Sequence, residues 1–208
     1  MTSMQRFMRA AAAAAAFAGA ALVPMALAHA QFVSKPEYRA LFAELEKTDV
    51  VVEGAKNPRG VLYVFFDANC YYCNLTWKAL QVYEKVGLRV RWVPVAYQQD
   101  SSWGRAAAIM QAADRTAALR ENELNYEAKS FSGGIRPLAK PQETVLAALR
   151  ANNKLLERTC VRGTPALLWK DAKGNIQCKP GTPRLSELPA ITGLPEQPIR
   201  DPELAKLR

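Results

Sequence analysis

The sequence predicts an α/β fold built on a central mixed sheet. Residues 61–66 form a continuous apolar run without alternation, which is typical of a strand buried on both faces. A helical pattern follows and stops at Gly87, and residues 88–95 return to extended character. Strand, helix and strand with short joints indicate a βαβ unit with parallel strands. Residues 166–169 and 176–179 flank a turn and predict a C-terminal β-hairpin.

Residues 1–30 have the pattern of a secretory signal peptide. Two arginines open the segment, an alanine-rich apolar stretch follows, and residues 28–30 (Ala-His-Ala) suit a signal peptidase. We therefore expect cleavage before Gln31 and export to the periplasm. An uncleaved membrane anchor is the alternative, but alanine contributes little to insertion and Pro24 interrupts the stretch.

The composition excludes several classes of function. His29 is the only histidine and would leave with the signal peptide, which excludes Ser-His and Cys-His catalysis and histidine-bearing metal sites. The net charge of +9 is scattered through the chain, without a dense basic tract interleaved with aromatic residues. We therefore expect no nucleic-acid partner.

Residues 31–58 predict a linker-like helix and a short strand. Ser34 is expected to cap a helix that ends near Lys47, because an acidic residue follows three positions later and a proline lies in the first turn. Residues 49–52 are rich in valine and predict a short strand.

The main domain is expected to span residues 59–194, with a helical insertion at about residues 99–158. The insertion begins with an alanine-rich and charged stretch, residues 101–129, which is poor in β-branched residues. A second helix is expected from Pro141 to about Arg158.

The C-terminal end is expected to be less ordered. A short helix near residues 185–191 follows the hairpin. Residues 195–208 contain three prolines and many charges, so we expect a mobile tail.

Cys70 and Cys73 lie where the first central strand gives way to a helix. A CxxC pair beside a βαβ pattern indicates a redox centre. Cys70 would lie at the helix N-terminus, where unpaired N–H groups and the helix dipole stabilise the thiolate, the form that attacks a disulfide. Cys73, one turn further in and more buried, would resolve the mixed disulfide.

Two alternative interpretations of the pair remain open. A four-cysteine zinc site would need a second close pair, but Cys160 and Cys178 are far apart in the chain. A purely structural CxxC staple would close only a small loop and stabilise little. We favour the redox centre and expect neither a metal nor an organic cofactor.

The order of strand, CxxC, helix, strand, helical stretch, Thr-Pro, hairpin and helix is the layout of a thioredoxin-like fold. Residues 66–73 (FDANCYYC) resemble the active-site stretch of the DsbC/DsbG family of periplasmic thiol–disulfide isomerases. Asp67 and Tyr72 match the family's Asp three residues before the first cysteine and its Tyr just before the second. Thr164-Pro165 matches the family's Thr before a cis-proline. The resemblance covers about residues 59–194.

The resemblance implies a protein thiol–disulfide oxidoreductase or isomerase. Thr164 and Pro165 would face the cysteines and offer backbone groups to an extended substrate segment. Asp67, Tyr71 and Tyr72 would support the site, and Tyr71 departs from the Gly or Pro usual in the family. The implied partners are cysteine-containing exported proteins and a membrane redox protein that resembles DsbD or DsbB.

The resemblance leaves out the family's N-terminal dimerisation domain. Only about 30 residues separate the expected cleavage site from the first central strand, so we expect a monomer or at most a weak dimer. Val64 also stands where reductive thioredoxins carry a buried Asp. A specialised chaperone-like or assembly factor of a secretion or conjugation system is the alternative function, and a binding module with an inert CxxC is a third.

Cys160 and Cys178 are interpreted as a structural disulfide, with two independent free thiols as the alternative. Cys160 lies in the loop five residues before Pro165, and Cys178 lies on the second strand of the hairpin. Because hairpin register alone would not place them opposite each other, the loop must fold back.

Two aromatic residues are candidates for substrate contact. Tyr97 and Trp103 lie near the loop after the strand at residues 88–95. We expect them either to line a substrate groove or to belong to the core.

Overall fold

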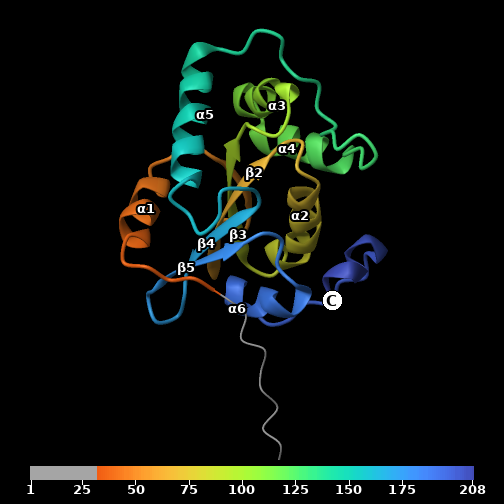
Figure 1. The fold of residues 1–208 in the computed structure, drawn as a ribbon. Coiled ribbons are helices and arrows are strands. Elements are labelled where there is room, and N and C mark those ends of the chain that lie inside the picture. The colour runs from red at the N-terminus through yellow and green to blue at the C-terminus, as the bar shows by residue number, and fades with distance from the viewer. Residues whose placement is uncertain (1–31) are drawn as a thin grey trace, which may run out of the picture.

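The computed structural model describes residues 32–208 as a five-stranded mixed sheet with helices on both faces (Figure 1). The predicted signal peptide and its cleavage site before Gln31 lie outside the described residues. Within residues 32–208, no helix combines the length and apolar character needed to cross a bilayer.

The long apolar strand lies at the centre of the sheet, as the sequence predicts. The strand order is β1-β3-β2-β4-β5. β2 pairs parallel with β3 and antiparallel with β4, and the edge strands β1 and β5 are antiparallel to their neighbours. The strands are β1 (Val51–Gly54), β2 (Gly60–Asp67), β3 (Leu88–Val95), β4 (Ala166–Lys170) and β5 (Ile176–Pro180).

Helices cover the two faces of the sheet because successive side chains of β2 point in opposite directions. Val64 and Phe66 pack in the cluster that contains α2 and α6, whereas Tyr63 and Phe65 pack with α1 and the end of α5. The α-helices are α1 (Tyr38–Leu45), α2 (Tyr71–Glu84), α3 (Asp100–Gln111), α4 (Arg115–Leu124), α5 (Glu143–Leu156) and α6 (Leu188–Thr192). The 3-10 helices are η1 (Leu185–Glu187) and η2 (Pro202–Leu207).

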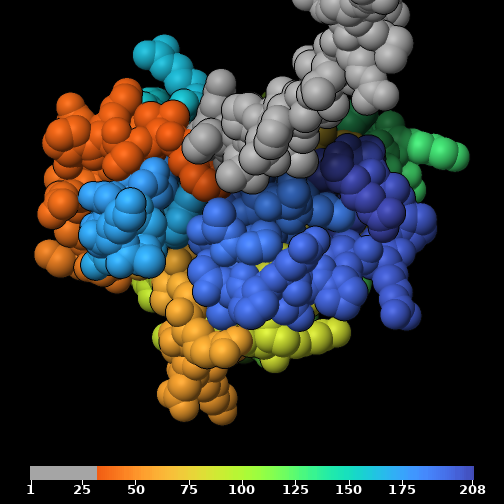
Figure 2. Space-filling model, turned by 90° about the horizontal axis from the view of Figure 1, so that it is seen from below, coloured from red at the N-terminus to blue at the C-terminus, as the bar shows by residue number. Residues whose placement is uncertain are grey.

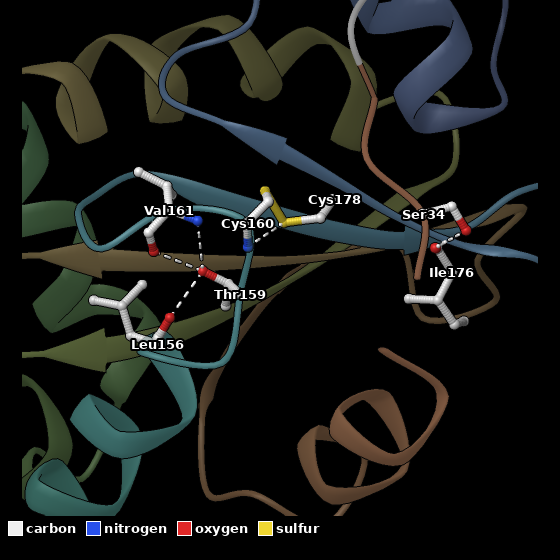
Figure 3. Close-up of a disulfide and its surroundings, with 7 residues drawn as sticks. All are labelled: Ser34, Leu156, Thr159, Cys160, Val161, Ile176 and Cys178. Atoms are coloured by element: carbon white, nitrogen blue, oxygen red, sulfur yellow. Dashed lines mark hydrogen bonds between the residues drawn. A yellow bond between two sulfur atoms is a disulfide. The ribbon is translucent and has the colours of Figure 1, made fainter. Parts of the chain in front are cut away.

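The predicted N-terminal cap of α1 is wrong. The Ser34 hydroxyl donates to the Ile176 carbonyl at 2.9 Å instead, and α1 begins only at Tyr38 (Figure 3). Val33 forms an antiparallel bridge with Cys178 on β5. The Ser34 hydroxyl therefore bonds to the edge strand β5 and does not cap α1.

Residues 195–208 differ from the predicted mobile tail. η2 packs against α2, Leu204 is only 1% exposed, and Lys78 on α2 forms a 2.5 Å ion pair with Glu203. Figure 2 shows the C-terminal segment, in dark blue, as part of the molecular surface. Leu204 and Leu207, three residues apart, give this charged segment an apolar face that the core covers.

A disulfide joins Cys160 to Cys178, with a Cα–Cα separation of 5.9 Å (Figure 3). The chain after α5 does fold back. The Thr159 hydroxyl lies 2.8 Å from both the Leu156 and the Val161 carbonyl oxygens, which tightens the turn. The bridge fixes this turn to β5, immediately before the Thr-Pro segment.

A buried polar cluster attaches the helical insertion to α2. Asn74 and Asn122 donate to the two carboxyl oxygens of Glu123, at 2.9 and 3.0 Å. The Oδ1 atoms of both asparagines have no hydrogen-bond partner among the described residues. Burial raises the pKa of Glu123 to about 8. A pKa this high leaves the Glu123 carboxyl largely protonated, and therefore neutral, at neutral pH.

Replacement of Glu123 by Gln should change how stability depends on pH. The folded pKa of about 8 lies above the ordinary value of 4.5, so the folded state binds an extra proton between these two values. The stability of the wild type should therefore fall as pH rises through this window and level off above it. Gln cannot ionise. We therefore expect the difference in free energy of unfolding, Glu123→Gln minus wild type, to rise by up to about 1.4 kcal/mol for each pH unit in this window.

Urea unfolding between about pH 5 and pH 8 measures this difference. Glu121→Gln, on the exposed face of the same helix, is the matched control. Its free energy of unfolding should vary with pH as that of the wild type does. If the free energy of unfolding of Glu123→Gln also varies with pH as that of the wild type does, Glu123 is not a neutral buried carboxyl.

Candidate active site

Cys70 lies at the start of α2, directly after the loop that leaves β2. Its backbone is extended, with φ −83° and ψ 111°, and its sulfur accepts a hydrogen bond from the Cys73 N–H at 3.2 Å. Cys70 therefore acts as the N-cap residue of α2, and its side chain satisfies one of the unpaired N–H groups of the first turn. A negative charge on this sulfur would be stabilised by the helix dipole.

The pKa values of the two thiols are shifted in opposite directions. The pKa of Cys70 lies below its ordinary value, chiefly because the Cys73 thiol donates a hydrogen bond to it. Burial opposes this, and contacts with Thr164, the Cys73 N–H and Gln98 lower the pKa of Cys70 further. Burial raises the pKa of Cys73 well above its ordinary value, and the hydrogen bond and charge of Cys70 add to this effect. The arrangement favours one thiolate and one thiol in contact.

Exposure does not distinguish the two cysteines, contrary to the expectation that Cys73 is the more buried. Cys70 is 2% exposed and Cys73 is 1% exposed. The difference between them therefore comes from hydrogen bonding, and a reaction partner must reach a sulfur that the neighbouring loops nearly cover.

Thr164 and Pro165 lie beside Cys70 because of strand register. Phe65 on β2 pairs with Ala166 on β4, which brings the residues before β4 level with the loop after β2. The Thr164–Pro165 peptide bond is cis. The Thr164 carbonyl oxygen lies 3.5 Å from the Cys70 sulfur.

Asp67 holds the loops around the thiols together. Its fully buried carboxylate accepts from Asn69 N and Ser102 Oγ through Oδ1, at 2.9 and 2.8 Å. Through Oδ2 it accepts from Tyr97 N and Gln98 N, at 2.9 and 3.1 Å. The sequence placed Asp67 at the site, and the structure gives it a positioning contact with the loop after β3.

Tyr97 and Gln98 contact Thr164 directly. The Tyr97 hydroxyl accepts from the Thr164 N–H at 2.8 Å, and Gln98 Nε2 donates to Thr164 Oγ1 at 3.1 Å. Sequence reasoning offered Tyr97 as either a groove-lining or a core residue, and it missed Gln98. The available signal was their position directly after β3, which ends beside β2. Trp103 lies elsewhere, beside Leu138 at a separate cavity.

The two tyrosines between the cysteines have different surroundings. Tyr71 packs against Tyr126 and Phe131, each with ring centroids 6.2 Å away, and the ammonium of Lys206 lies 4.5 Å from its ring centroid. Tyr71 therefore links the insertion, α2 and η2. Tyr72 is 59% exposed and remains free for contact at the surface.

The cysteines do not form a four-thiolate zinc site. Cys160 and Cys178 are joined to each other, which leaves only Cys70 and Cys73 as free thiols. Over residues 32–208, no three His, Cys, Asp or Glu side chains gather in a metal-binding arrangement.

The curated proteins that are similar to this chain include two thiol:disulfide interchange proteins. Thiol:disulfide interchange protein DsbG of Pseudomonas aeruginosa is 27% identical over 164 residues, which cover 78% of this chain and 62% of the relative. The DsbG of Escherichia coli K12 is 26% identical over 159 residues, which cover 76% and 62%. The chain thus spans about three fifths of the length of these relatives.

Solved structures confirm the predicted fold. A periplasmic thioredoxin-like protein from Salmonella enterica serovar Typhimurium superposes with a TM-score of 0.57 at 24% identity, over 73% of this chain and 93% of that one. The profile of the thioredoxin-like domain matches residues 45–191. The mixed five-stranded sheet, the CxxC at the start of α2 and this match together show that the chain belongs to the thioredoxin-like domain family.

Proposed function

We propose that this protein is an exported thiol–disulfide oxidoreductase that exchanges disulfides with protein cysteines through Cys70 and Cys73. The observation that carries the proposal is the place of Cys70 at the start of α2, where its sulfur accepts from the Cys73 N–H at 3.2 Å and lies 3.5 Å from the Thr164 carbonyl oxygen. The opposite directions of the two pKa shifts agree with this placement. The similarity to thiol:disulfide interchange proteins supports it.

The exchange begins with attack of the Cys70 thiolate on a substrate disulfide. A bond forms between Cys70 and one substrate sulfur, the substrate S–S bond breaks, and the other substrate sulfur leaves as a thiolate. Cys73 then loses its proton and attacks the Cys70 sulfur, which expels the second substrate thiolate. The substrate gains two electrons and the Cys70–Cys73 pair becomes a disulfide. The reverse sequence oxidises a substrate dithiol.

Residues around the thiols would position the substrate. The Thr164 backbone, beside the Cys70 sulfur and followed by Pro165, would pair with an extended segment. Asp67 would hold the loops in place, and Tyr72 would contribute an exposed aromatic surface. Tyr71 would contribute indirectly, by fixing the start of α2 against the insertion.

The proposal extends to organisation and partners. Residues 1–30 would be removed on export to the periplasm, residues 31–58 would pack on the domain at 59–194 through α1 and β1, and residues 195–208 would cover α2. Partners would be cysteine-containing exported proteins and a membrane redox protein similar to DsbD or DsbB. Because α1 and β1 pack on the sheet of this domain, we propose a monomer or weak dimer.

A second function is favoured by two exposed aromatic residues, Tyr72 beside Cys73 in the chain and Phe131, which packs against Tyr71. Tyr72 and Phe131 are 59% and 55% exposed, which suits a chaperone-like or assembly factor that binds a client. A Cys70→Ser, Cys73→Ser double variant distinguishes the two functions. Client binding that persists without either thiol favours the factor, and binding that is lost favours the oxidoreductase.

A Cys73→Ala variant should trap the first covalent intermediate. Cys70 can still attack a disulfide-containing peptide, but no second thiol is present to release it. Incubation with such a peptide should therefore give a stable mixed disulfide at Cys70, detected by intact mass and peptide mapping. Cys70→Ala is the matched control and should give none. Adducts at Cys73 in that control, or none in Cys73→Ala, would contradict the assigned roles.

The group at position 73 should also set the acidity of Cys70. With Cys73 replaced and the other two cysteines joined, iodoacetamide reports on Cys70 alone. Cys73→Ala removes the hydrogen bond that contributes most to the lowered pKa of Cys70, whereas Cys73→Ser keeps an O–H donor. We expect the pH profile of alkylation to lie at higher pH for the Ala variant. Identical profiles would show that this hydrogen bond does not stabilise the thiolate.

A further inference from the structure

Thr164 has its own hydrogen-bonding groups occupied by neighbouring side chains. Its N–H donates to the Tyr97 hydroxyl at 2.8 Å, and its carbonyl oxygen faces the Cys70 sulfur at 3.5 Å. The Tyr97 hydroxyl also lies 3.0 Å from Thr164 Oγ1. An incoming backbone carbonyl can therefore accept from the Thr164 N–H only after the Tyr97 hydroxyl has moved away.

The backbone around Tyr97 is fixed on both sides. Asp67 accepts from the N–H groups of Tyr97 and Gln98. The preceding residue, Ala96, exchanges two hydrogen bonds of 3.0 Å with the side-chain amide of Asn153. Displacement of the hydroxyl would therefore involve rotation of the Tyr97 side chain and no movement of the loop.

The Tyr97 side chain has space for this rotation. The residue is 46% exposed and borders a cavity of about 450 Å³. The other residues that line this cavity are Asn153, Leu156, Glu157 and Arg162. Gly163 adds no obstacle, because even a Cβ atom at this position would lie 3.7 Å from the Tyr97 hydroxyl.

We propose that Tyr97 is a specificity-determining residue whose hydroxyl occupies the place of the substrate's backbone carbonyl and must be displaced by it. The inference rests on the proposed function. A segment that can pair along its backbone with Thr164 replaces the hydrogen bond it breaks. A small disulfide without peptide groups reacts at Cys70 with Tyr97 still in place. The contact thus selects extended cysteine-containing segments through competition at one N–H group.

The Tyr97→Phe variant tests this competition, because it removes the hydroxyl and keeps the ring. Reduced protein is mixed with either of two disulfides at neutral pH, and second-order rate constants are measured. One is an unstructured peptide dimerised through a central cysteine, and the other is cystamine, which has no peptide groups. We expect Tyr97→Phe to raise the ratio of the rate constant with the peptide to the rate constant with cystamine about two- to tenfold, the range for loss of one competing hydrogen bond.

Tyr38→Phe is the matched control. Tyr38 is buried in the cluster around α1, and its hydroxyl has no hydrogen-bond partner within residues 32–208. This variant should react like the wild type with both disulfides.

The outcomes separate this inference from the proposed function. An unchanged or lower ratio of the two rate constants in Tyr97→Phe would overturn the inference, because an equal change with both disulfides would lie on the thiol. If the wild type reacts with neither disulfide, the proposed function fails and the inference fails with it.

Discussion

The buried carboxylate of Asp67 fixes the geometry on which the rest of the site depends. It ends the central strand and accepts four hydrogen bonds from two other parts of the chain, the Cys70 loop and the start of the insertion. A buried carboxylate with this many donors is stable in one orientation only. Because Asp67 bonds both to the loop before Cys70 and to the backbone of Tyr97 and Gln98, it fixes these two residues beside Thr164 relative to Cys70.

The electrostatics of the site also depend on burial. Glu123, on the inserted helix α4, stays neutral at moderate pH because burial raises its pKa to about 8. An ionised Glu123 near the start of α2 would oppose the Cys70 thiolate, since the charges of these two groups repel each other. The neutral carboxyl lets the insertion pack against the thiol pair and still leave Cys70 as the stabilised anion.

Local sequence patterns predict the parts of the site that lie on one continuous segment. The apolar run, the CxxC and the helix that follows have periodicities that identify β2 and α2, and Thr164-Pro165 stands directly before the next apolar strand. The contacts from the insertion could not be predicted in this way. Asn74 and Glu123, which share one buried polar cluster, are 49 residues apart in the chain. The docking of η2 was missed because Leu204 lies among charges and prolines, where only tertiary packing shows its burial.

Stabilisation of the Cys70 thiolate by the fold should appear in the reduction potential of the Cys70–Cys73 pair. A thiolate stabilised in the reduced protein favours the dithiol over the disulfide, which makes the pair more oxidising. Equilibration with glutathione redox buffers should therefore give a potential less negative than about −270 mV, the value for thioredoxin. A potential at or below that value would show that the hydrogen bonds and helix position around Cys70 do not stabilise its thiolate enough to make the pair an oxidant.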